Sequence, residues 1–183
     1  MLVSFDLAVD YVLEREGGLE EDKDGKDPGG ISKYGISLRF LLNLTDPRKY
    51  GFSPGTINKG TIEQLTLDQA KALYKGEFWD HFPIATINNQ ANANFIFDMA
   101  VNMGIAPAVK CAQRACCAVM KRRAALADDG IMGNATIEMI NHCSSYLLPA
   151  MRSERAGEYR MIAVINPGEK EDLDGWLTRA YGA

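Results

Sequence analysis

The apolar residues at the start of the chain recur at the spacing of one helical face, and the pattern stops at a pair of glycines. Positions i, i+3, i+4, i+7 and i+8 are occupied by Phe5, Ala8, Val9, Val12 and Leu13. The next position on this face is Glu16, and Gly17 and Gly18 follow it directly. We therefore expect an amphipathic helix over residues 4–16, with a carboxylate where its buried stripe ends.

The position of Glu16 admits two interpretations. A carboxylate on a buried face is costly unless it serves a purpose, and the negative end of the helix dipole disfavours an anion. Both effects favour the protonated form, which a general acid needs. Alternatively, Glu16 is a solvated acid one turn beyond the core. The glycines after it are expected to turn the chain through a positive φ and to leave room for a ligand.

The rest of the chain alternates turn-rich segments with helical patterns. Residues 19–35 are polar and rich in glycine, and residues 41–64 are rich in turn dipeptides. Helical patterns cover residues 66–79 (with a capping box at Thr66), 88–103, 107–126 and most of 135–165. The predicted fold class is mainly α (α+β), with a small irregular or β insert after the first helix.

Composition excludes several classes of protein. A chain of 183 residues, 46% hydrophobic and 24% charged, suits one globular domain or one domain with a small appendage. The net charge of −4 argues against a nucleic-acid binder. No apolar run approaches the ~20 residues of a membrane span, so we expect no integral membrane protein. The N-terminus has acids where a Sec signal peptide has a basic start, so synthesis in the cytoplasm without such a signal is expected.

The cysteines and histidines do not form a metal-binding pattern. The four cysteines contain no C-x-x-C pair, and the two histidines are far apart in sequence. We therefore expect buried free thiols, as in a reducing compartment, and neither a metal nor an organic cofactor.

Three polar residues form a stripe on the otherwise apolar pattern of residues 88–103. Asn94, Asp98 and Asn102 recur every four residues. On a central helix such a stripe either lines a cleft or is paired within the protein, and the sequence leaves both possibilities open.

The loop after Glu16 contains a second group of candidate residues. Asp24, Asp27, Ser32 and Tyr34 all follow the acid-tipped helix. Two carboxyl groups near each other are the minimum set for glycoside hydrolysis, because one protonates the leaving oxygen and another group orients water or stabilises the cation.

Six ordered blocks extend this pattern along nearly the whole chain. They are VLEREGG, DPGGISKYGIS, LTLDQAKALYKGEFWD, FDMAVNMG, DDGIMGNAT and DGWLTRA. On these blocks the sequence resembles glycoside hydrolase family 108, the bacterial and phage N-acetylmuramidases. The family has a GG-x-T-x-x-GI pattern in the second block, and this chain departs from it with Ser32 in place of the usual threonine.

The resemblance implies a lysozyme-like fold with the acid catalyst in the E-G-G motif, which is Glu16. Similarity to the Glu–Asp–Thr arrangement of phage-type lysozymes implies that Asp27 and Ser32 complete the catalytic set, with Asp24 as the alternative to Asp27. It also implies a catalytic region over residues 1–104 and a helical peptidoglycan-binding region over residues 105–183, packed together as one compact unit.

The implied activity is hydrolysis of the β-1,4 bond between N-acetylmuramic acid and N-acetylglucosamine. Protonated Glu16 serves as the general acid and a water held by Asp27 and Ser32 attacks, which favours inversion, while retention stays open. The residues expected to line the sugar cleft are Tyr34, Trp79, Asp98 and Asn102. A chitinase and a non-catalytic wall-binding or secretion-accessory protein are the alternatives.

The expected partners are the glycan strands of peptidoglycan. Action at the bacterial cell wall or periplasm by a protein without a Sec signal requires a holin, a dedicated secretion system or lysis. A prophage endolysin, a secretion-system wall opener and a housekeeping hydrolase are equally compatible with the sequence.

Overall fold

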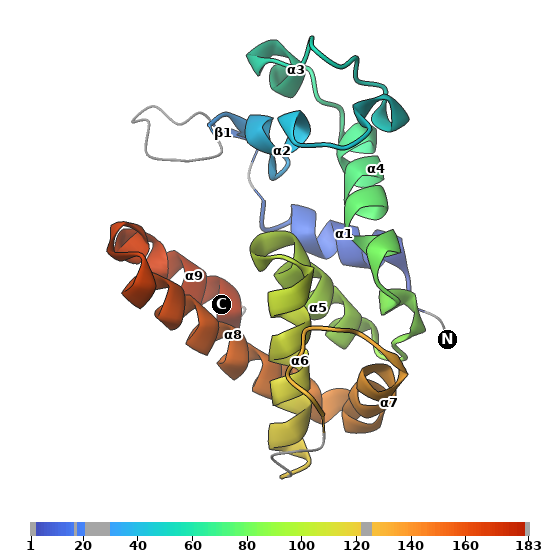
Figure 1. Ribbon diagram of the computed structural model, residues 1–183, viewed down its shortest axis with the longest axis vertical. Helices are drawn as coiled ribbons and strands as arrows, with labels where there is room; N and C mark the ends of the chain where they lie inside the picture. Colours follow the sequence, from blue (N-terminus) through green and yellow to red (C-terminus); the bar gives the residue numbers. More distant parts are fainter. Residues whose placement is uncertain (1–2, 17, 21–29, 122–125, 182–183) are drawn as a thin grey trace. The chain divides into compact units, whose positions relative to one another are not determined.

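A computed structural model describes residues 3–16, 18–20, 30–121 and 126–181 of the chain (Figure 1). Helices predominate among these residues, and one small sheet follows the first helix, so the predicted fold class is confirmed. The chain forms two compact units. We call residues 9–81 the N-terminal unit and residues 1–8 with 82–183 the C-terminal unit.

The first helix, α1 (Phe5–Leu13), belongs to both units in sequence. Ala8, Val9 and Val12 are fully buried, which confirms the predicted apolar face. The regular helix ends three residues earlier than predicted. However, the backbone N–H of Glu16 still donates to the carbonyl of Val12 at 3.1 Å, so helical hydrogen bonding continues as far as the acid.

A three-stranded antiparallel sheet follows in the N-terminal unit. Its strands are β1 (Leu19–Glu20), β2 (Ser32–Lys33) and β3 (Ile36–Ser37), in that spatial order. Lys33 pairs with Ile36, so only two residues connect β2 to β3. This sheet is the small β insert that the sequence predicted.

The remaining elements of the N-terminal unit are short helices. They are α2 (Leu38–Leu42), η1 (Pro47–Tyr50), α3 (Lys59–Glu63), α4 (Leu67–Glu77) and η2 (Trp79–His81). The predicted capping box at the start of α4 is present, because Thr66 and Gln69 bond reciprocally. The sequence analysis missed α2 and α3, since five-residue helices surrounded by turn residues have too few positions to show a helical period.

All the regular secondary structure in the described part of the C-terminal unit is helical. Its elements are η3 (Ile84–Thr86), α5 (Gln90–Met103), α6 (Ile105–Val119), α7 (Asn134–Cys143), η4 (Ser144–Tyr146), α8 (Leu147–Ile165), η5 (Pro167–Asp172) and α9 (Leu173–Tyr181). α6 packs against α5 and α8, and α8 packs against α9 (Figure 1). Gly104, with a φ of 92°, ends α5 as predicted and lets α6 begin in a new direction. The sequence analysis did not predict α9, which follows the break at Pro167.

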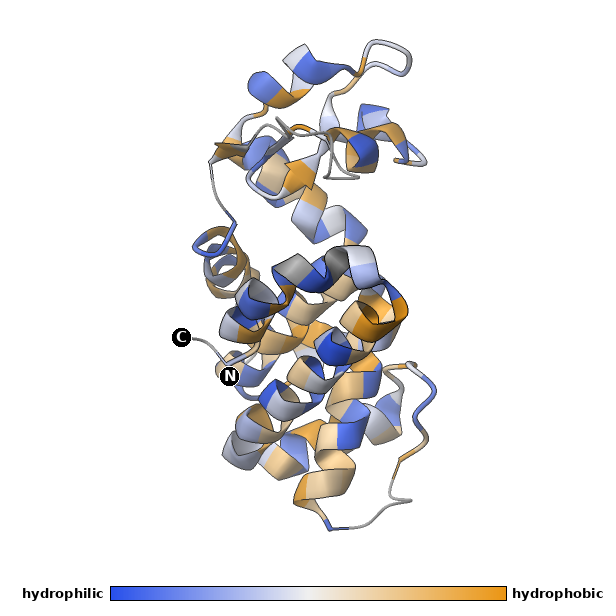
Figure 2. Cartoon of the chain, turned by 90° about the vertical axis from the view of Figure 1, so that its left-hand side faces the viewer, coloured by the Kyte–Doolittle hydropathy of each residue, from blue (hydrophilic) through white to orange (hydrophobic). Residues whose placement is uncertain are grey.

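Hydrophilic and hydrophobic residues lie side by side along these helices (Figure 2), as expected for helices that pack by one face. None of the described helices combines the length and apolar character needed to cross a membrane.

Candidate active site

Glu16 lies at the end of the turns that continue α1. Its side chain is half-buried, whereas the neighbouring Glu14 is exposed. Arg15 turns back, donating to the carbonyl of Tyr11 at 2.8 Å and covering the Tyr11 ring. Of the three consecutive charged residues, only Glu16 thus continues the packed face of the helix with a carboxyl group.

The two-residue turn between β2 and β3 lies against Glu16. Tyr34 and Gly35 have φ values of 54° and 74°, and two positive φ values are characteristic of the type I′ hairpin turn. A Cβ atom built on Gly35 in ideal geometry would lie 2.8 Å from Cγ and 2.9 Å from Cδ of Glu16. Any side chain at position 35 would therefore collide with the carboxyl group of Glu16.

The turn itself contains backbone strain. A non-glycine residue in the left-handed region, as Tyr34 is here, costs about 1–2 kcal/mol. Gly35 adopts this conformation without that cost. Strain of this kind persists only where surrounding contacts hold the backbone in place, and it is common at functional sites.

Gly18 follows the acid by two residues in sequence. No described atom lies within 4 Å of a Cβ atom built on Gly18. Its φ is not positive, so the sharp turn predicted at the glycine pair is not made by Gly18. Gly17 lies outside the described residues.

The other predicted residues of this region are only partly described. Ser32 lies on β2, where it pairs with Glu20 and Ser37 and is half-buried. Asp24 and Asp27 lie outside the described residues. Their proposed roles stay predictions.

Two of the predicted sugar contacts belong to the same unit as Glu16. Tyr34 is half-buried and immediately precedes Gly35, so it adjoins the carboxyl group. Trp79 begins η2 and is buried, with 6% of its surface exposed. Tyr34 thus lies beside the candidate acid, and the sugar-binding roles of Tyr34 and Trp79 stay predictions.

Asp98 and Asn102 belong to the C-terminal unit, where both have protein partners. Asp98 is fully buried and accepts from Arg155 at 2.5 Å and from Arg179 at 2.6 Å. Tyr159 donates to Asn102 at 2.6 Å and accepts from Arg155 at 2.8 Å. The polar stripe of α5 is therefore tied to α8 and α9, which is the internal pairing that the sequence left open. Burial also raises the pKa of the Tyr159 phenol, despite the nearby Arg155.

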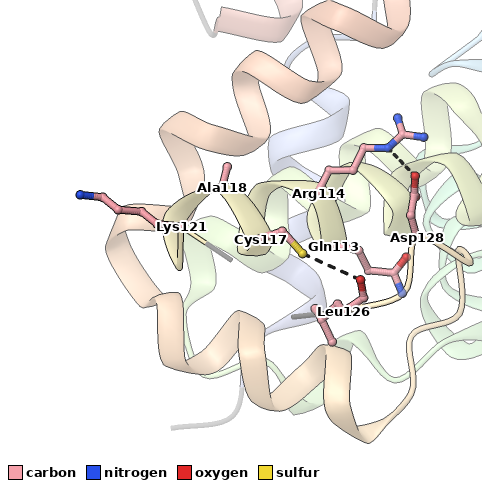
Figure 3. A pocket seen from close by; sticks show the side chains of 7 residues that line it. All are labelled: Gln113, Arg114, Cys117, Ala118, Lys121, Leu126 and Asp128. Carbon is pink, nitrogen blue, oxygen red and sulfur yellow. Dashed lines mark hydrogen bonds and ion pairs between the residues drawn. The ribbon is translucent and has the colours of Figure 1, made fainter. Parts of the chain in front are cut away.

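A pocket of about 530 Å³ lies in the C-terminal unit, at the end of α6 (Figure 3). An ion pair between Arg114 and Asp128, 2.7 Å long, closes one side of it. Cys117 and Leu126 form part of its apolar lining, with the thiol directed at the carbonyl of Leu126. Of the predicted site residues that the structure describes, none lines this pocket.

Among the described residues, no group of three His, Cys, Asp or Glu side chains is arranged to hold a metal ion. The described part of the site supplies the carboxyl group of Glu16. A half-buried carboxyl group beside an exposed turn is restrained on one side and accessible on the other. Such a group can exchange a proton with a ligand bound over the turn, as general acid catalysis requires.

Gly35 is a site residue that the sequence analysis did not single out. It is part of the quoted block DPGGISKYGIS. A glycine at the second position of a two-residue connection between polar strands is the signal that identifies it, because type I′ turns favour glycine there.

Comparisons with known proteins bear on the family and the fold of this chain. The sequence profile of a family described as glycosyl hydrolase 108 matches residues 9–104, slightly more than half of the chain. A solved structure, of SagA from Brucella abortus, is 21% identical, with an alignment that covers 97% of this chain and 94% of that one and a TM-score of 0.66. At this identity the likeness concerns the fold. A search of curated proteins found no match.

Proposed function

Because the chain belongs to glycosyl hydrolase family 108 and is therefore a glycoside hydrolase, we propose that it is an N-acetylmuramidase with Glu16 as the general acid. Family membership supports peptidoglycan hydrolysis as the general activity. The finer proposal is cleavage of the β-1,4 bond between N-acetylmuramic acid and N-acetylglucosamine. One observation carries the role of Glu16: its half-buried carboxyl group lies against an exposed glycine turn that leaves no space for a side chain.

In this mechanism Glu16 protonates the glycosidic oxygen while a water molecule attacks the anomeric carbon from the opposite face. Asp27 and Ser32 hold that water, Asp27 accepts the proton that the water loses as it attacks, and the reaction inverts the anomeric configuration. The hydroxyl of Ser32 can accept and donate hydrogen bonds as the family's threonine does. The choice of Asp27 over Asp24 rests on the family resemblance.

Tyr34 and Trp79 are the proposed sugar contacts in the N-terminal unit. The exposed turn beside Tyr34 supports its part of this proposal. Asp98 and Asn102 remain in the proposal only as residues to be tested, since their bonds to Arg155, Arg179 and Tyr159 favour a structural role.

The proposed place of action is the bacterial cell wall, and a holin or a secretion system is the proposed route to it. The division into a catalytic region, residues 1–104, and a wall-binding region, residues 105–183, is likewise a proposal about function. The matched family segment ends at residue 104, which supports it.

The test is the Glu16→Gln variant with Glu14→Gln as its control. The amide keeps nearly the same size and loses the transferable proton, so we expect hydrolysis of purified peptidoglycan to fall by about 10²-fold or more at an unchanged melting temperature. Glu14→Gln removes an exposed acid two residues away and is expected to keep full activity. Activity of Glu16→Gln within about tenfold of the parent contradicts the assignment.

The products distinguish the alternatives. A muramidase releases new reducing ends at N-acetylmuramic acid from peptidoglycan. A chitinase clears chitin gels instead, and a binding protein hydrolyses neither peptidoglycan nor chitin. Proton NMR of the first products reports the stereochemistry, because inversion of a β bond yields the α anomer before mutarotation.

A further inference from the structure

Tyr74 of α4 makes contact with the turn beside Glu16. Its side chain is 1% exposed, and its hydroxyl donates to the carbonyl of Tyr34 at 2.8 Å. A phenol has one proton to donate, so this bond uses it. Its ring packs against Phe78, with 6.2 Å between centroids, and Phe78 stacks on Phe40 of α2 at 5.9 Å. Packing of the Tyr74 ring against these aromatic side chains thus fixes the position of its phenol oxygen.

The turn that Tyr74 holds is the strained one. The carbonyl that accepts the bond belongs to Tyr34, which has a φ of 54°, and Gly35 follows with a φ of 74°. A surrounding contact must hold a non-glycine residue in this conformation. The bond from the buried phenol is such a contact, since it fixes the carbonyl between the two turn residues.

The phenol oxygen of Tyr74 and the carboxyl group of Glu16 both lie close to Gly35. A Cβ atom on Gly35 would lie 2.5 Å from Oη of Tyr74, compared with 2.8 Å and 2.9 Å from Cγ and Cδ of Glu16. The acid, the turn glycine and the phenol oxygen therefore meet around one point. A shift of the turn moves the surface against which the carboxyl group packs.

We propose that Tyr74 is a positioning residue for the carboxyl group of Glu16, acting through the turn at Tyr34 and Gly35. The proposal rests on the assignment of Glu16 as the general acid. Tyr74 belongs to the block LTLDQAKALYKGEFWD, so the proposal gives this block a second role beside the sugar contact proposed for Trp79.

The first test compares Tyr74→Phe with Tyr50→Phe. Tyr50 is also buried in the N-terminal unit, and its hydroxyl donates to Glu77 rather than to the turn. Both variants lose one phenol hydrogen bond, so both are expected to lower the melting temperature, Tyr50→Phe by the larger amount because its acceptor is a carboxyl group. Only Tyr74→Phe should lower kcat, by about 10- to 100-fold with little change in KM, because small misplacements of a catalytic group reduce the rate that strongly.

The second test compares Gly35→Ala with Gly55→Ala. Gly55 has a φ of 82°, and a Cβ atom there has no neighbour within 4 Å among the described residues. Both alanines are strained by a positive φ, and only the one at position 35 meets Glu16 and Tyr74. We expect about 10²-fold loss of kcat for Gly35→Ala and a rate within about threefold of the parent for Gly55→Ala.

The third measurement places Tyr74→Phe in the Glu16→Gln background. If Tyr74 acts through Glu16, its substitution has no further effect on the residual rate there. An undiminished effect in that background, or an equal loss of kcat in Tyr74→Phe and Tyr50→Phe, would overturn the proposal. Full activity of Glu16→Gln is a separate result that overturns the assignment of the acid.

Discussion

At the scale of single residues, the candidate site depends on contacts that only a few side-chain types satisfy. Glu16 is half-buried against Gly35, and no other residue fits at position 35 without displacing the acid. Helical phase predicted that Glu16 continues the buried face, and its half-buried side chain agrees with that prediction. The glycine that receives it could not be identified as its neighbour, because the two lie on different elements.

The loop acids provide a prediction at this scale. Asp27→Asn should reduce peptidoglycan hydrolysis more than Ser32→Ala does, because a carboxylate orients a water molecule more strongly than a hydroxyl group. The rates of Asp24→Asn, Asp27→Asn and Ser32→Ala would be measured at equal protein concentration. A large loss in Asp24→Asn together with a normal rate in Asp27→Asn would show that Asp24 is the second carboxylate.

The four cysteine thiols provide a second prediction at the scale of single residues. The structure records four free cysteines, and burial raises the pKa of Cys111 to about 12 and that of Cys116 and Cys143 above its ordinary value. Since the thiolate is the reactive form, these three should react slowly with a thiol reagent in the native protein. Cys117 is only half-buried and should react first. In denaturant all four should titrate without a reductant, and a smaller count would reveal a disulfide.

At the scale of elements, α5 shows how one helix serves the interior of the C-terminal unit. Its polar stripe is bonded at each position: Gln90 donates to Asn94 at 2.6 Å, and Asp98 and Asn102 pair with residues of α8 and α9. Asn102 is nevertheless exposed, whereas Asp98 is fully buried. The two residues therefore call for separate tests.

Asn102→Ala tests the exposed end of the stripe. Loss of the bond from Tyr159 leaves a largely buried phenol without that acceptor, so we expect destabilisation of about 1 kcal/mol, seen as a lower melting temperature, with an unchanged kcat. The opposite pattern, an unchanged melting temperature and reduced activity, would assign Asn102 to the sugar cleft instead.

At the scale of the whole molecule, the chain joins two units of different construction. Residues 9–81 combine a small sheet with short helices and contain Glu16, while the C-terminal unit is built on packed helices linked by a buried ion-pair network. Both Arg155 and Arg179 pair with the carboxylate of Asp98 in this network.

Asp98→Asn should therefore destabilise the protein strongly. The substitution leaves the buried Arg155 and the nearby Arg179 facing a neutral amide, and breaking a buried pair in this way typically costs about 3–5 kcal/mol. Asp128→Asn is the control in the same unit, because Asp128 pairs with Arg114 at the surface, where a salt bridge contributes about 0–1 kcal/mol. Denaturant unfolding measures both, and similar losses for the two variants would contradict a structural role for the network.

The sequence by itself determined the features that depend on neighbours along the chain. The apolar face of α1, the acid at its end, the capping box at Thr66 and the end of α5 at Gly104 all follow from local spacing and backbone preference. The family resemblance likewise rests on blocks of consecutive residues. Such features need no knowledge of what packs against them.

Only the tertiary structure decided which residues meet. The partners of Asp98 lie 57 and 81 positions away, and Tyr74 lies 40 positions from the carbonyl that it holds. Periodicity shows that a polar stripe or a buried tyrosine exists. What these side chains contribute to stability depends on the groups that they contact, and those groups come from elements distant in sequence. For the same reason, the sequence alone does not show that a side chain at position 35 would collide with Glu16. That contact exists only after folding has brought the turn and the end of α1 together.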